Sequence, residues 1–212
     1  MKKHHVFNLI ILDESGSMEA IKVATLSGFN EVVQTIQGAQ EQFADQLHTV
    51  TLVTFNGLGI KTILANQPVD KLTVLDATRY VPDATTPLHD ALGKSLMRLE
   101  WLTERETNYT VLVSILTDGE ENASREFSAS QVRALIDRLK LRNWSFTYMG
   151  ANHDAERVAS TLSIPNWVHF EADEQGVKAV FEAERKGRMA YYEKRGRGLS
   201  SHESEADYYK QP

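Results

Sequence analysis

The sequence has 212 residues, 42% of them apolar, with a formal net charge of −6 and no cysteine. This length suits a single α/β domain with a short extension, and the apolar content is enough for a packed core. The absence of cysteine excludes disulfides and thiolate metal sites and permits a reducing compartment. The acidic balance argues against a nucleic-acid partner.

The first apolar run, Val6–Leu12, is nearly uninterrupted and ends at Asp13. Such a short, β-rich run predicts a strand buried on both faces of a sheet. It lacks the small-residue cleavage site that follows a secretory signal, and no stretch approaches the roughly 18 to 20 apolar residues of a membrane span. We therefore expect a cytoplasmic protein that does not insert into a membrane. The sequence does not indicate its oligomeric state.

A helix and a hairpin are predicted next. Apolar residues recur at helical spacing from Ile21 to Ile36, with Gly38 as the expected end of that helix. Two β-rich runs, Val50–Phe55 and Ile60–Leu64, flank the turn pair Asn56-Gly57. This pattern predicts a hairpin and hence one antiparallel pair of strands.

The second half of the sequence alternates between predicted helices and strands after an irregular segment over residues 70–83. Pro87 opens a helix with leucines at helical spacing, and Ser128 with Gln131 has the pattern of a capping box. The remaining predicted elements are a strand at Thr110–Leu116, a strand at Trp144–Met149, a helix at His153–Leu162, a strand at Trp167–Glu171 and a final helix at Glu174–Tyr191.

Strands that alternate with helices predict a Rossmann-like α/β fold. We expect a three-layer sandwich in which a mostly parallel sheet with one antiparallel edge strand has helices on both faces. A single domain is expected over residues 1–191. Residues 192–212 are charged and rich in Gly and Ser, which predicts a poorly ordered tail. From Arg185 onward, seven Lys/Arg outnumber four Asp/Glu, so the tail is mildly basic.

Oxygen-bearing side chains follow two predicted strands and precede one helix. They are Asp13, Ser15 and Ser17 in the first turn, Thr86 before the helix opened by Pro87, and Asp118 after Thr110–Leu116. Ligands of open parallel sheets bind outside the carboxyl ends of the strands, so these segments are expected to converge. Carboxylates and hydroxyls suit a hard cation, of which Mg²⁺ is the first choice and Mn²⁺ or Ca²⁺ are possible.

Three segments, taken in this order, resemble the metal-ion-dependent adhesion site of von Willebrand factor A (VWA) domains. They are Asp13-Glu14-Ser15-Gly16-Ser17, Thr86-Pro87-Leu88 and Leu116-Thr117-Asp118-Gly119. The resemblance covers roughly residues 5–185 and, with the missing signal, suggests an intracellular, bacterial-type member. It implies a non-enzymatic protein-binding module. Asp13, Ser15, Ser17, Thr86 and Asp118 would hold the metal, and an acidic side chain of a protein partner would complete its coordination.

Two features depart from the family pattern. Many members have Gly-x-Thr where this chain has Ala84-Thr85-Thr86, so Thr85 competes with Thr86 for the ligand role. Glu120 and Glu121 add two acids beside Asp118, and the sequence does not define their role.

Two other functions stay open at this stage. One is a Mg²⁺-dependent phosphate-transfer enzyme that uses Asp13 as nucleophile, although no motif places a general acid or base beside it. The other is a structural interaction domain whose metal site is vestigial. The identity of the partner and the biological pathway are not encoded in any recognisable motif.

Overall fold

Strand β1 (His4–Asp13) runs through the centre of a six-stranded sheet in the computed structural model, which describes residues 3–210. Its central position follows from its sequence, since apolar side chains point to both faces. Leu12 and Ile10 enter the core cluster on one face, and Leu9 and Ile11 enter the cluster on the other.

The sheet has the order β3-β2-β1-β4-β5-β6, in which every neighbouring pair is parallel except β2 with β3. The other strands are β2 (Gln46–Asn56), β3 (Gly59–Pro68), β4 (Tyr109–Thr117), β5 (Trp144–Gly150) and β6 (Asn166–His169). The predicted hairpin around Gly57 is therefore confirmed, and it supplies the antiparallel edge strand.

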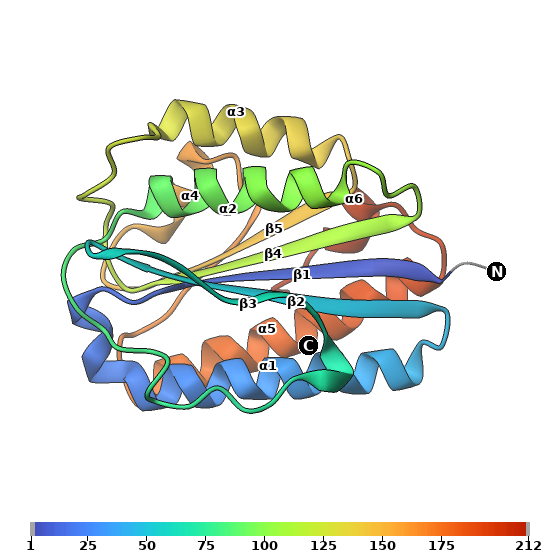
Figure 1. Cartoon of the computed structure of the whole chain (residues 1–212), viewed down its shortest axis with the longest axis horizontal. Coiled ribbons are helices and arrows are strands. Elements are labelled where there is room, and N and C mark those ends of the chain that lie inside the picture. The colour runs from blue at the N-terminus through green and yellow to red at the C-terminus, as the bar shows by residue number, and fades with distance from the viewer. Residues whose placement is uncertain (1–2, 211–212) are drawn as a thin grey trace.

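Helices cover both faces of the sheet, with α1 and α5 on one face and α2, α3 and α4 on the other (Figure 1). The helices are η1 (Gly16–Ile21), α1 (Lys22–Gln42), η2 (Val69–Lys71), α2 (Leu88–Thr103), α3 (Ala129–Lys140), α4 (Ala155–Thr161), α5 (Glu174–Gly196) and α6 (Ser201–Glu205). The capping box of Ser128 and Gln131 is present at the start of α3. The predicted three-layer α/β fold is confirmed.

The first helix does not end at Gly38, as the sequence suggested. α1 continues to Gln42 because Ala39 is fully buried in the core beyond the glycine. Packing of this turn outweighs the modest cost of a glycine inside a helix.

The expected disordered tail is folded over residues 192–210. Helix α5 continues to Gly196, and α6 follows it with its own capping box. Tyr192 and Tyr208 are almost completely buried. Composition predicts poor order here because it does not register the buried partners of the tyrosine hydroxyls, which are Asn8 of β1 and Arg188 for Tyr192 and Glu184 of α5 for Tyr208.

None of the helices in the described residues is both long and apolar enough to cross a membrane.

Candidate functional site

The carboxyl ends of the parallel strands lie at one end of the molecule, where the connecting loops gather (Figure 1). β1 ends at Asp13 and β4 ends at Thr117, and these strands are direct neighbours in the sheet. Asp13 and Asp118 therefore stand side by side as a consequence of the strand order, at the edge where open parallel sheets bind ligands.

Asp13 is fully buried, and both of its carboxylate oxygens accept hydrogen bonds. The backbone N–H of Ser15 donates to Oδ1 at 2.7 Å, and the hydroxyl of Thr117 donates to Oδ2 at 2.6 Å. Tyr80 donates its hydroxyl to the backbone carbonyl of Asp13. These contacts fix the orientation of the carboxylate before any ligand arrives.

A chain of hydroxyls links the first loop to Asp118. Ser15 Oγ and Ser17 Oγ lie 3.4 Å apart, and Ser17 Oγ donates to Asp118 Oδ1 at 2.6 Å. Asp118 is itself almost fully buried. Four of the five predicted ligands thus belong to one hydrogen-bonded cluster.

Thr86 is the threonine that faces this cluster. Thr86 is 4% exposed. Its hydroxyl oxygen is close to Gly119, the residue after Asp118, since it lies 3.5 Å from the point where a side chain on that glycine would begin. Thr85 is exposed, and its hydroxyl is directed to Gly57 in the turn between β2 and β3. The geometry therefore favours Thr86 over Thr85 as the oxygen donor.

Asn122 holds Thr86 in place. The Thr86 N–H donates to Asn122 Oδ1 at 2.9 Å, and the Asn122 N–H donates to the Thr86 carbonyl at 3.1 Å. The third loop therefore fixes the backbone of the second.

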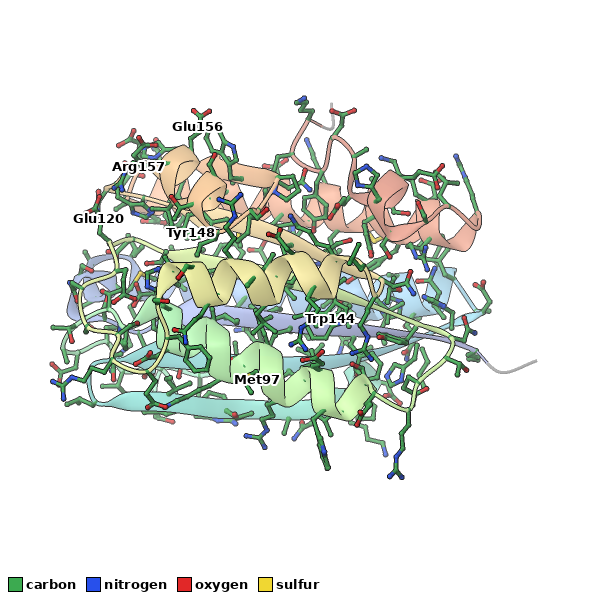
Figure 2. All side chains as sticks on the ribbon, turned by 90° about the horizontal axis from the view of Figure 1, so that it is seen from above. Met97, Glu120, Trp144, Tyr148, Glu156 and Arg157 are labelled. Carbon is green, nitrogen blue, oxygen red and sulfur yellow. The ribbon has the colours of Figure 1, made fainter. Side chains whose placement is uncertain are left out.

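The additional acids have other partners. Glu121 accepts the N–H of His89 near the start of α2 at 2.8 Å and two backbone N–H groups of its own loop. Glu120 is exposed and pairs with Arg157 of α4 at 2.8 Å, at the loop end of the molecule (Figure 2). Glu14 is buried and pairs with Lys61 of β3. Glu121 and Glu14 support the loops, while Glu120 lies at the rim.

The cluster has an excess of negative charge. Burial raises the pKa of Asp13 to about 6, and the charge of Asp118 adds to the rise. Burial also raises the pKa of Asp118. Neither carboxylate belongs to an ion pair formed by the described residues. Protein groups alone thus supply less positive charge than these two acids need, which fits a site for a cation.

The donor set itself also fits a hard cation. It consists of two carboxylates and three hydroxyls, all oxygen. No group of three or more His, Cys, Asp or Glu able to hold a metal occurs within residues 3–210. A site here would therefore depend on the serine and threonine hydroxyls.

Sequence reasoning missed three supporting residues: Thr117, Tyr80 and Asn122. Thr117 stands beside Asp118 in the third segment, so its place at the end of a buried strand was a usable signal. Tyr80 lies in an irregular segment, and Asn122 acts through a contact with Thr86 across 36 positions. Neither carries a local pattern.

The strand order, the layered helices and the oxygen-rich edge define a Rossmann-like α/β domain with a candidate cation site. The chain belongs to the von Willebrand factor type A domain family, whose model matches residues 9–183. The membership of the VWA family that the sequence predicts is confirmed. A comparison with curated protein sequences gave no match.

Several solved structures share the fold. Proximal thread matrix protein 1 from the mussel byssus has 14% identity and a TM-score of 0.58, over 88% of this chain and 46% of that chain. The pilus adhesin SpaC from Lactobacillus rhamnosus GG has 14% identity and a TM-score of 0.62, over 91% and 31%. The SpRpn10 VWA domain has 12% identity and a TM-score of 0.55, over 84% and 93%. This chain spans less than half of the first two proteins, and at these identities the likeness is one of fold.

Proposed function

We propose that this domain binds one divalent cation, Mg²⁺ in the first instance, and uses it to capture a protein partner through an acidic side chain. VWA domains often mediate protein interactions. The observation that carries the proposal is the buried pair Asp13 and Asp118, which is joined by serine hydroxyls and has no ion-pair partner among the described residues.

Each residue has a defined part in this proposal. Ser15, Ser17 and Thr86 would offer hydroxyl oxygens to the ion, and Asp118 and Asp13 would offset its charge. The bound cation would supply the positive charge that holds a partner's carboxylate. Thr117 and Asn122 would act as positioning residues, because they hold Asp13 and Thr86.

The metal-binding step is tested by calorimetric titration with Mg²⁺. We expect the Asp118→Ala variant and the Ser15→Ala/Ser17→Ala double variant to lose uptake of the ion while the far-UV circular dichroism spectrum is unchanged. Glu120→Ala is the matched control. It removes an acid from the same loop as Asp118, but this acid is exposed and pairs with Arg157. An unchanged titration in Asp118→Ala would contradict the proposal.

The capture step is tested by a pull-down with and without a chelator. We expect proteins retained by the wild-type domain to be lost with the chelator and with Asp118→Ala, and to be kept with Glu120→Ala. Retention that is indifferent to both treatments would favour a structural interaction domain with a vestigial metal site, as would the absence of metal in elemental analysis of the purified protein.

Phosphate transfer is the weaker alternative. Both oxygens of Asp13 are engaged by hydrogen bonds and the side chain is fully buried, which disfavours a nucleophilic role. Turnover of a generic phosphate ester that disappears in Asp13→Asn would support this alternative. A cytoplasmic location, which the lack of cysteine permits, stays a prediction.

A further inference from the structure

A groove of about 580 Å³ lies between α2 and the edge hairpin of β2 and β3. None of the five candidate metal ligands lines it. It therefore offers a second site, distinct from the oxygen cluster. Its volume falls within the usual range of small-molecule pockets, about 300–1,000 Å³.

The groove has an apolar interior. Ser95, Leu99 and Leu102 are spaced four and three residues apart along α2, so they share the helix face that lines the groove. Val53 of β2 and Ile60 of β3 line it from the sheet. These aliphatic side chains provide a surface for the apolar body of a ligand.

The rim of the groove combines an aromatic ring with positive charge. Trp101 is 73% exposed, which is unusual for so large an apolar side chain. Lys94 and Arg98 also line the groove from α2. Lys94 pairs with Glu126 at 2.5 Å, whereas Arg98 belongs to none of the ion pairs formed by residues 3–210 and donates only to Thr62 Oγ1, at 3.1 Å.

Arg98 has no acidic partner among residues 3–210. On the same helix, Glu100 pairs with both Arg138 and Arg142 of the α3 region. None of the residues that line the groove is acidic, and the neighbouring Glu126 is paired with Lys94, although the protein as a whole has a net charge of −6. An unpaired guanidinium beside an apolar groove is suited to a carboxylate.

Ser95 adds a buried hydroxyl to the α2 wall of the groove. Ser95 is 6% exposed, and its hydroxyl has no hydrogen-bond partner within the described part of the chain. A buried hydroxyl without a partner is costly unless another group satisfies it. Ser95 precedes Arg98 by one helical turn, but its hydroxyl oxygen is buried behind the groove wall, so the exposed guanidinium of Arg98 is the group that a ligand meets.

We propose that this groove binds a small amphipathic carboxylate. Its apolar body packs against Leu99, Leu102 and Val53, and its carboxylate pairs with the guanidinium of Arg98.

The test is a calorimetric titration with decanoate below its micelle concentration, with decyltrimethylammonium as the cation of matched chain length. We expect saturable binding of decanoate with a Kd below about 1 mM and weaker binding of the cation. Arg98→Gln should weaken decanoate binding at least about tenfold, and Arg98→Glu should reverse the preference between the two probes. Decanoate bound at the rim should also quench the fluorescence of Trp101. The Trp101→Phe variant should show no such quenching.

Two further variants complete the test. Ala65→Trp places a large side chain in the groove at an exposed position and should abolish binding. Arg105→Gln should leave the affinity unchanged, because Arg105 is exposed on the loop after α2 and does not line the groove. An affinity for decanoate that is equal in wild type, Arg98→Gln and Ala65→Trp would overturn the proposal, and so would the absence of saturable binding up to about 1 mM.

Discussion

Ala84 adopts a left-handed backbone conformation, with a φ of 62°. It directly precedes Thr85 and Thr86, and its carbonyl accepts the N–H of Gly16 at 3.0 Å, which joins the second loop to the first. A side chain in this region costs about 1–2 kcal/mol because Cβ approaches the carbonyl. The glycine that many family members have here avoids that cost, whereas in this chain the strained residue also joins the two loops through its carbonyl.

Ala84→Gly is therefore expected to stabilise the protein. Relief of the left-handed strain outweighs the greater freedom of glycine in the unfolded chain, for a net gain of about 0.5–1 kcal/mol in the free energy of unfolding. Urea denaturation with an unchanged m-value measures it. Ala206→Gly is the matched control: its φ is −56°, so it should lose about 0.4–1 kcal/mol. Equal losses in both variants would show that Ala84 is not strained.

At the scale of elements, α5 is tied to the sheet and to the tail by a buried polar network. Glu184 Oε1 accepts from Ser114 of β4 at 2.6 Å and from Arg188 at 2.8 Å, and its Oε2 accepts from Tyr209 at 2.9 Å. Arg188 donates in turn to Asn8 of β1 at 2.8 Å. Because the two charges are almost fully buried, the network is stable only while every member is satisfied.

Glu184→Gln should destabilise the protein by about 3–5 kcal/mol, since it leaves Arg188 without a buried counter-charge. Glu182→Gln on the same helix is the control. Glu182 pairs with Lys186 at the surface, where such pairs contribute at most about 1 kcal/mol. Denaturant midpoints of the two variants provide the comparison. Similar midpoints would mean that the Glu184–Arg188 pair contributes no more than a surface pair.

At the scale of the whole molecule, the sequence predicts what depends on near neighbours. The apolar run of β1, the turn at Gly57 and the cap at Ser128 are local patterns, and the order of elements follows from them. The place of Thr86 beside the cluster is fixed by Asn122, and the order of the tail depends on contacts such as that between Tyr192 and Asn8, 184 positions apart. Composition carries no trace of such pairs.

His48 connects the stability of the whole molecule to pH. It is completely buried against Tyr192, with Nε2 at 3.0 Å from Gln46 Oε1. Burial, followed by the charge of Arg188, lowers its pKa from 6.5 to about 3. The folded protein therefore holds His48 neutral over a range in which the unfolded chain binds a proton, so its contribution to stability is complete above pH 6.5 and is lost as the pH falls toward 3.

We therefore expect the wild type to lose about 2 kcal/mol of unfolding free energy through this one residue between pH 7.5 and pH 5. The unfolding free energy is measured against pH for the wild type and for His48→Gln. The difference between the two profiles is the contribution of His48, because Asp13 contributes equally to both. The pKa of Asp13 is raised in the fold, so Asp13 acts in the opposite direction. The comparison variant is His202→Gln, which removes a histidine whose side chain is 95% exposed and so separates the effect of a buried imidazole from that of a surface one. Parallel profiles for wild type and His48→Gln would mean that water reaches the imidazole and that this part of the core opens well below the global unfolding free energy.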